Sequence, residues 1–145
     1  MRRNHNTNSV ERILDANINR AKEGLRVCEE VARFILNSRV LSSAFKDLRH
    51  GIDSALIHLP SRKKIIMQRD ALTDVGKGLL GNELKRKNVA DIFSANLQRV
   101  KESVRVLEEF SKLYAKRPAL AFKDIRYKLY ALEKRIAKNE SARLR

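Results

Sequence analysis

The chain carries one block of polar residues twice, and the residue types are those that bind phosphate groups. Asparagine, arginine and glutamate recur in the same order within residues 13–34 and 92–113, at an offset of 79 positions. Arginine binds anionic oxygens, and carboxylates hold Mg²⁺ beside phosphates. A repeat needed only for packing would preserve mainly apolar positions. The duplicated polar pairs include Asn17/Asn96, Arg20/Arg99, Glu23/Glu102, Arg26/Arg105 and Glu30/Glu109.

Some of these residues have a simpler explanation as ion pairs on the surface of a helix. Arg26 and Glu30 are four residues apart, which is the spacing of an ordinary helix pair. In a simple bundle we expect one group of charged residues to face outward and to be solvated: Lys22, Arg26, Glu29 and Arg33.

Asn17 and Arg20 need another explanation, because helical periodicity places both within the apolar arc of their helix. A buried Asn or Arg is costly unless it has a partner. Asn96 and Arg99 occupy the same positions within the apolar arc of the helix in the second copy. We therefore predict that these four side chains meet around one polar cavity that holds a ligand.

Two helical hairpins must position these residues. Asn8 with Glu11 resembles a capping box that starts the first helix, and Asn88 with Asp91 starts the third. Pro118 suits the first turn of the fourth helix. The expected helices span about 8–38, 39–58, 88–116 and 118–138.

The predicted fold class is all-α. We expect an antiparallel helical bundle made from two duplicated hairpins, about 8–58 and 88–138, related by a pseudo-twofold axis. A second match supports the duplication, because AFKDLRH at 44–50 returns as AFKDIRY at 121–127. A length of 145 residues predicts a single domain over residues 1–145.

A long central loop, residues 59–87, joins the hairpins and is not repeated. It is basic and contains three of the five glycines, so it is a candidate functional segment. Its carboxylates, Asp70 and Asp74, either hold Mg²⁺ beside phosphates or cap a turn. Residues 76–81 match G-x-G-x-x-G without the βαβ context that would give that motif meaning. Residues 65–68, IIMQ, fit a short strand or a helical extension.

The formal net charge is +15, and removing residues 1–8 and 136–145 still leaves +11. Such a charge attracts nucleic acid, acidic membranes or phosphorylated small molecules. The lone cysteine, Cys28, forms no intramolecular disulfide and is expected in the core. With no apolar run long enough for a membrane span and no leader pattern, we expect a cytoplasmic protein with no membrane partner.

Several motifs in order resemble a small all-α family of thiamin biosynthesis, the hydroxymethylpyrimidine phosphate kinases, found alone or fused ahead of thiamin-phosphate synthase. They are DAN-I-x-R-A-K-E-G-L-R-V-x-E-E-x-A-R-F, K-D-L-R-H, R-D-x-x-x-D-V-G and A-N-x-x-R-x-x-E-x-x-R-V-L-E-E-F, within residues 10–135. One departure is Ser94, where the first copy has Asp15. This chain carries no synthase barrel.

The resemblance implies an ATP-dependent phosphotransferase. The γ-phosphoryl group of ATP would pass to 4-amino-5-hydroxymethyl-2-methylpyrimidine phosphate and give the diphosphate, with ATP and Mg²⁺ as cofactors. Since the acceptor is already an anionic phosphate, the reaction needs alignment and charge neutralisation rather than a strong base. The chain offers many arginines and no convincing nucleophile–base pair.

The resemblance and the residue types together assign roles to individual residues. The expected catalytic residues are Arg20, Arg99, Arg69, Glu23 and Glu102. The expected substrate- and phosphate-binding residues are Asn17, Asn96, Arg26, Arg105, Arg49, His50, Lys77 and Gly76. The expected metal ligands are Asp70, Asp74, Glu30 and Glu109. We expect the central loop to close over the phosphates.

The alternative is a basic helical module that binds nucleic acid or protein without catalysis. It would place the basic residues on one outer face. The inward-facing duplicated residues and the small number of aromatics argue against nucleic acid as a partner. Tyr127 and Tyr130 are expected at the edge of the core, with stacking on a heterocycle as the alternative. A homodimer stays open, because a dimer or the central loop would have to cover Arg26 and Arg105.

Overall fold

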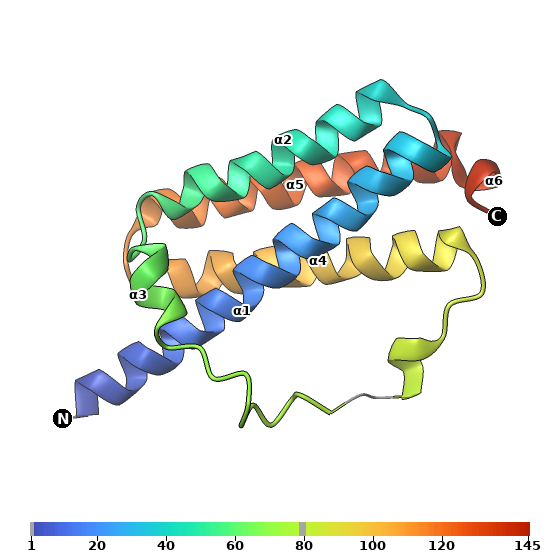
Figure 1. Cartoon of the computed structure of the whole chain (residues 1–145). Coiled ribbons are helices and arrows are strands. Elements are labelled where there is room, and N and C mark those ends of the chain that lie inside the picture. The colour runs from blue at the N-terminus through green and yellow to red at the C-terminus, as the bar shows by residue number, and fades with distance from the viewer. Residues whose placement is uncertain (1, 79–80) are drawn as a thin grey trace.

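Four long helices form the body of the molecule (Figure 1). The computed structural model describes residues 2–78 and 81–145, and all regular elements in those residues are helices. The long helices are α1 (Arg2–Glu30), α2 (Arg39–Leu56), α4 (Val89–Ser111) and α5 (Lys116–Asn139). α1 packs against α2 and α4, and α5 packs against the same two helices. The predicted all-α bundle is therefore confirmed, whereas the pseudo-twofold relation of the hairpins stays a prediction.

Short helical elements complete the chain. A π-helical turn, η1 (Val31–Ile35), ends the first long helix, and α6 (Ser141–Leu144) lies near the C-terminus. The central segment contains α3 (Arg62–Ile66) and a 3-10 turn, η2 (Gly81–Leu84). The expected continuous loop over 59–87 is thus interrupted, because the Ser61 side chain caps α3 by accepting from the Lys64 N–H. The G-x-G-x-x-G stretch falls partly on residues 79–80, outside the described residues.

The start of α4 agrees with the prediction from the sequence, whereas the start of α1 does not. Asn88 caps α4 as predicted, because its side chain accepts from the Asp91 N–H at 2.9 Å. The predicted capping box at Asn8 is wrong, since α1 already begins at Arg2. No glycine or proline interrupts residues 2–10, and the Glu11 side chain is buried beside Lys64 instead of reaching back.

Apolar residues recur every three or four positions on each long helix and form one core. On α2 the buried positions include Leu41, Phe45, Leu48 and Ile52. Cys28 is fully buried within this core as expected, and burial raises the pKa of its thiol to about 12. In the described residues, no helix has an apolar stretch long enough to cross a membrane.

The helices α1 and α4 approach each other closely at Gly24. A Cβ atom there would lie 2.6 Å from Val100 Cγ2 and 3.1 Å from the Asn96 carbonyl oxygen. Both neighbours belong to α4, and Val100 is fully buried. Only glycine therefore lets the two helices pack at this separation.

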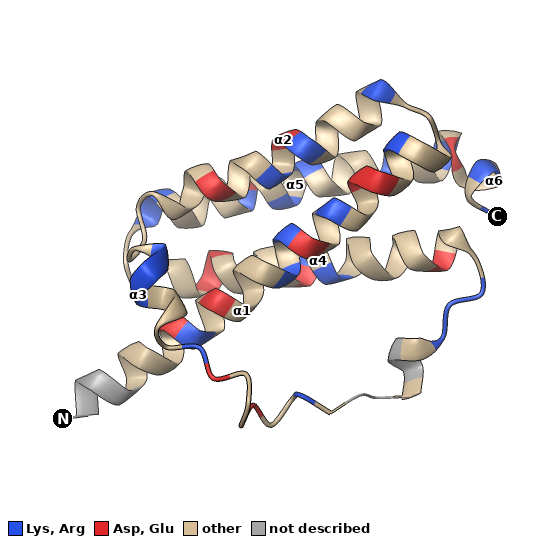
Figure 2. Cartoon of the chain, in the orientation of Figure 1, with Lys and Arg blue, Asp and Glu red and all other residues tan. Residues whose placement is uncertain are grey.

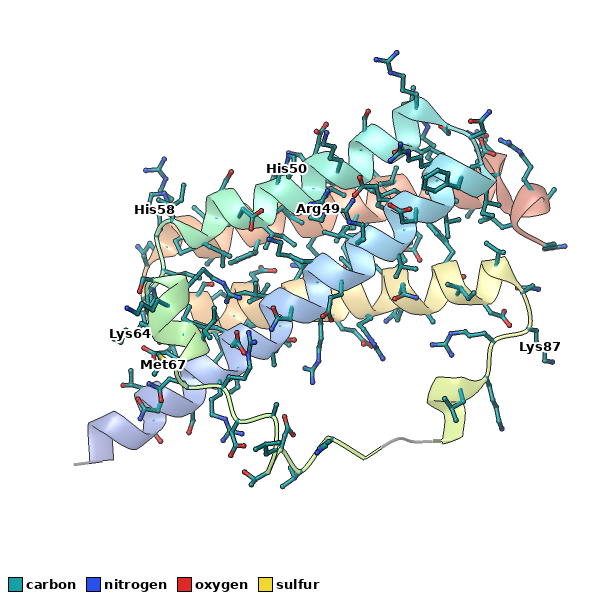
Figure 3. All side chains as sticks on the ribbon, in the orientation of Figure 1. Arg49, His50, His58, Lys64, Met67 and Lys87 are labelled. Carbon is teal, nitrogen blue, oxygen red and sulfur yellow. The ribbon has the colours of Figure 1, made fainter. Side chains whose placement is uncertain are left out.

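Each hairpin is tied together by a buried Glu–Arg pair at corresponding positions. Glu29 Oε2 accepts from Arg49 Nε at 3.1 Å, and Glu108 Oε2 accepts from Arg126 Nε at 2.7 Å. In Figure 3, Arg49 lies between α2 and α1. The expectation that Glu29 is solvated is wrong, because its partner on the next helix lets the carboxylate be buried.

The same pairing fixes the ionisation of Glu108. Burial opposes the charged form, but the hydrogen bond and charge of Arg126, with the charges of Arg105 and Lys112, outweigh it and lower the pKa of Glu108. The hydrogen bonds of Arg126 with Glu108 and with the Tyr130 hydroxyl group raise the pKa of Arg126. The pair is therefore charged at neutral pH.

Replacing Gly24 by alanine should destabilise the fold by about 1–3 kcal/mol, because the added methyl group overpacks the α1–α4 contact. Denaturant unfolding measures the change. Gly51→Ala on α2 is the matched control, since its Cβ would meet Ile125 at an ordinary 3.6 Å. The control should be neutral or slightly stabilising, and equal stability of Gly24→Ala and wild type would contradict the close approach.

Replacing Glu108 by glutamine should lower the free energy of unfolding near pH 7 by about 3 kcal/mol, because it breaks a buried ion pair. The melting temperature should fall with it. Because the folded-state pKa of Glu108 lies below its ordinary value of 4.5, the wild-type contribution is complete above that value and disappears as pH falls through the folded-state pKa. Melting temperatures measured from pH 7 down to pH 3 should therefore converge for the two proteins. A difference in melting temperature that stays constant from pH 7 to pH 3 would show that the charged Glu108 carboxylate is not the source of the stabilisation. Glu133→Gln, at a more exposed pair with Lys101, is the control.

Candidate functional site

A bidentate ion pair joins α1 to the segment that follows α3. Arg69 Nε and Nη2 donate to the two oxygens of Asp15 at 2.6 and 2.7 Å. The Asp15 side chain is 4 % exposed, so this carboxylate depends on its partner for compensation. Arg62 of α3 adds a longer contact, 3.6 Å from Nη1 to Oδ1 of Asp15. The hydrogen bond and charge of Asp15 also raise the pKa of Arg69.

A second ion pair strengthens the same junction. Lys64 Nζ lies 3.3 Å from Oε1 of the fully buried Glu11. Burial, with the charge of Glu11, raises the pKa of Tyr114. We call the ion pairs of Glu11 and Asp15 with Lys64, Arg62 and Arg69 the α1 clasp. Figure 2 shows these charges concentrated where α3 and the following segment meet α1, and Figure 3 labels Lys64 on α3.

An open cavity of about 490 Å³ lies beside the α1 clasp, between the first half of α1 and residues 69–74, and Asp15 and Arg69 of the clasp line it. Three arginines and three aspartates line it, together with Asn17 and small or apolar side chains. The charged residues of the wall are Arg12, Arg20, Arg69, Asp15, Asp70 and Asp74. Arg69 already donates to Asp15, so Arg12 and Arg20 are the cations best placed to bind an anionic ligand.

Asp70 and Asp74 each shape the turn that forms the outer wall. Asp70 accepts hydrogen bonds from the N–H and the hydroxyl group of Thr73, and Asp74 Oδ1 accepts from the Gly76 N–H at 2.7 Å. The Thr73 bonds, assisted by the charge of Arg12, lower the pKa of Asp70. Both carboxylates therefore cap turns. Among the described residues, no group of three or more carboxylate, histidine or cysteine side chains is arranged to hold a metal alone.

The four residues expected around one cavity do not all line it. Asn17 and Arg20 do, whereas Asn96 and Arg99 are absent from its wall. The two asparagines have local partners, since each side-chain amide donates to the carbonyl four residues earlier at 2.8 Å. Arg20 and Arg99 are exposed, so their placement inside an apolar arc is wrong. A long arginine at the border of such an arc reaches water with its charged end.

Apart from Arg69, Asp70 and Asp74, which line the cavity, the other expected site residues lie outside it. Arg26 and Glu30 pair on α1, and Arg105, Glu109 and Lys112 pair on α4. Glu102 and Arg105 line a different hollow between α4 and α5. His50 is exposed on the outer side of α2 (Figure 3). The remaining residues, none of which lines the cavity, are Glu23, Arg49, Gly76 and Lys77.

A larger hollow of about 530 Å³ lies between α2 and α5 but is less suited to chemistry. Its floor is made by apolar side chains such as Leu48, Ile125 and Leu132, and it contains none of the expected site residues. The cavity beside the α1 clasp is therefore the better candidate site, because three arginines and three aspartates from two separate segments line it.

The roles of Glu11, Arg12 and Asp15 were not inferred from the sequence. A signal was available for Asp15, because the second copy has Ser94 at the corresponding position. The segment 59–87, which contains the partner of Asp15, lies between the two copies and is not part of the repeat. A repeat position that differs between the copies indicates a contact with a part of the chain that is not repeated.

Comparison with known proteins gives a consistent family. The ThiD2 family matches residues 12–135. Relatives named thiamine-phosphate synthase include those of Nostoc punctiforme, 44 % identical over 86 % of this chain, and Synechocystis sp., 43 % identical over 86 %. The relative from Rhodopirellula baltica is 40 % identical over 88 % of this chain. The alignments cover 34, 35 and 34 % of these three relatives, so the chain spans about one third of their length. No solved structure matches.

Replacing Asp15 by asparagine should release the segment after α3, because the amide cannot accept both donors of Arg69 as a charged pair. We expect amide hydrogen exchange in residues 65–74 to rise at least about fivefold while exchange in α4 and α5 stays unchanged. Asp53→Asn, which removes the exposed pair with Lys22, is the matched control. Unchanged exchange in residues 65–74 of Asp15→Asn would show that the α1 clasp does not hold this segment.

Proposed function

Because the chain belongs to the ThiD2 family, we propose that it phosphorylates 4-amino-5-hydroxymethyl-2-methylpyrimidine phosphate to the diphosphate, with ATP and Mg²⁺. The name of its relatives, thiamine-phosphate synthase, supports a role in thiamin biosynthesis. The specific kinase reaction comes from the motif resemblance and from the chemistry of the candidate site. A thiamin-phosphate synthase activity is not proposed, because this chain spans only about one third of those relatives.

The observation that carries the proposal is the cavity of about 490 Å³ beside the α1 clasp. Its wall brings Arg12 and Arg20 of α1 against Asp70 and Asp74 of the central segment. Phosphoryl transfer to an acceptor that is itself a phosphate needs little covalent chemistry from the protein. It needs the two phosphates to be held in line and their negative charge to be neutralised, which cations and a bridging metal ion do.

The donor set of the cavity fits Mg²⁺ that is shared with the substrates. Mg²⁺ is commonly bound by one or two carboxylates, with substrate phosphates and water as its other ligands. Asp70 and Asp74 supply two carboxylates, and the lowered pKa of Asp70 keeps that group ionised. When bound, the ion neutralises charge on the phosphate oxygens.

The protein's own residues then have separate tasks. Arg12 and Arg20 bind phosphate oxygens from α1, and the Asn17 side chain offers its carbonyl oxygen while its amide is held by Ile13. The ion pair of Asp15 with Arg69 keeps the segment that carries Asp70 and Asp74 against α1. Cys28 takes no part, because it is buried and its thiol has a raised pKa.

A coupled assay of purified protein tests the proposal. With ATP, Mg²⁺ and the pyrimidine monophosphate, we expect one ADP and one pyrimidine diphosphate per turnover, and only background ADP when the pyrimidine is omitted. Folded protein that releases no ADP with this acceptor would overturn the kinase assignment. Tight, salt-sensitive binding of RNA or DNA by the same inactive protein would instead support the nucleic-acid alternative.

Variants of the cavity wall test phosphate binding by the arginines and metal binding by the aspartates separately. Arg20→Ala should lower kcat/KM by more than about tenfold without lowering the melting temperature, because Arg20 is exposed and its charge stabilises the transferred group. Asp74→Asn should lower kcat far more than it raises KM. Arg39→Ala, at the exposed start of α2, removes the same charge elsewhere and should leave both constants unchanged. Wild-type rates for both cavity variants would exclude this cavity as the site.

A further inference from the structure

The two hairpins share a buried Glu–Arg pair but present different side chains beside it. In the first hairpin, His50 and Asp53 follow Arg49 on the surface of α2. At the corresponding positions, 77 residues later, α5 carries Tyr127 and Tyr130. These tyrosines are 58 and 43 % exposed, so they do not lie at the edge of the core as expected. The second hairpin therefore offers aromatic surface to solvent at positions where the first hairpin has a histidine and an aspartate.

Arg126 holds the two tyrosines in a fixed arrangement. Its Nη1 donates to the Tyr130 hydroxyl oxygen at 3.1 Å, and its guanidinium carbon lies 5.4 Å from the centre of the Tyr127 ring. The rings are edge to face, with centroids 5.7 Å apart. Since Arg126 is itself held by Glu108, the ring of Tyr130 is positioned before any ligand arrives. Such preorganisation lowers the entropic cost of stacking.

A hollow of about 350 Å³ opens beside Tyr130, between α4 and α5. Gln98, Lys101, Glu102 and Arg105 complete its wall. Gln98 donates to Glu102 at 3.2 Å, which leaves the second oxygen of Glu102 to accept from a ligand. Arg105 is half exposed, and its two terminal nitrogens lie 3.4 Å from a carboxylate oxygen of Glu108 and of Glu109. Lys101 is held by Glu133.

We propose that this hollow binds an aminated aromatic heterocycle that carries a phosphate group, at a site separate from the cavity beside the α1 clasp. The ring stacks on Tyr130, the exocyclic amino group donates to Glu102, and Arg105 binds the phosphate. ATP and an aminopyrimidine phosphate share this chemistry. The choice of ligand class rests on the proposed kinase function, whereas the location rests on the tyrosines and the hollow. The molecule bound here is additional to the two whose phosphates react beside the α1 clasp.

Binding without turnover tests the proposal. Isothermal titration uses three probes: a non-hydrolysable ATP analogue, the aminopyrimidine phosphate and inorganic triphosphate, which has no ring. Tyr130→Ala should weaken binding of at least one of the heterocycles about tenfold, because stacking is lost, and leave inorganic triphosphate unaffected. Tyr130→Phe keeps the ring and should bind within about twofold of wild type. Asp53→Ala, at the corresponding position of the first hairpin, is the matched control and should bind like wild type.

Each outcome decides the proposal. A loss confined to the ATP analogue shows that the hollow binds the nucleotide, and a loss confined to the pyrimidine shows that it binds the pyrimidine phosphate; both results support the proposal. The proposal would be overturned if Tyr130→Ala bound both heterocycles with wild-type affinity. It would also be overturned if the variant lost as much affinity for inorganic triphosphate as for the heterocycles. Circular dichroism verifies that the variant is folded. Because no transfer is measured, a chain that makes no ADP but shows the Tyr130-dependent binding would refute the kinase and keep this site.

Discussion

The ion pair between Asp15 and Arg69 is the interaction on which the candidate site depends. It joins residues 54 positions apart through hydrogen bonds of 2.6 and 2.7 Å. Asp15 is almost fully buried, so the pair cannot open without leaving a carboxylate uncompensated. Because Asp15 is fixed by the helix around it, the pair also fixes where Asp70 and Asp74 lie. The cavity wall is therefore set by one bidentate contact, supported by Lys64 and Glu11.

The duplication explains the body of the molecule, and the differences between the copies explain the site. Glu29 with Arg49 and Glu108 with Arg126 tie their hairpins in the same way. Serine replaces Asp15 in the second copy, at Ser94, and the segment 59–87 lies between the two copies and is not part of the repeat. One half of the chain thus carries the α1 clasp and its cavity. The other half carries exposed tyrosines and a smaller hollow.

Local signals predicted the helices well, and contacts between distant residues were harder to foresee. The 3–4 spacing of apolar residues and the cap at Asn88 are local, and both appear as expected. The burial of Glu29 depends on Arg49, which lies 20 residues away, and periodicity alone carries no such information. Arg20 illustrates a different limit, because a wheel position describes the Cα direction and not the reach of a long side chain. Asp70 and Asp74 were foreseen as either turn caps or metal ligands, and the turn contacts are visible in the fold.

The central claim is that the cavity beside the α1 clasp binds the phosphate groups that react. A crystal structure of the chain with a non-hydrolysable ATP analogue, Mg²⁺ and the pyrimidine monophosphate tests it most directly. The account predicts phosphate oxygens within hydrogen-bond distance of Arg12 and Arg20, and the metal ion beside Asp70 or Asp74. Phosphates bound on another face, with the cavity lined by residues 12–20 and 69–74 occupied only by water, would contradict it.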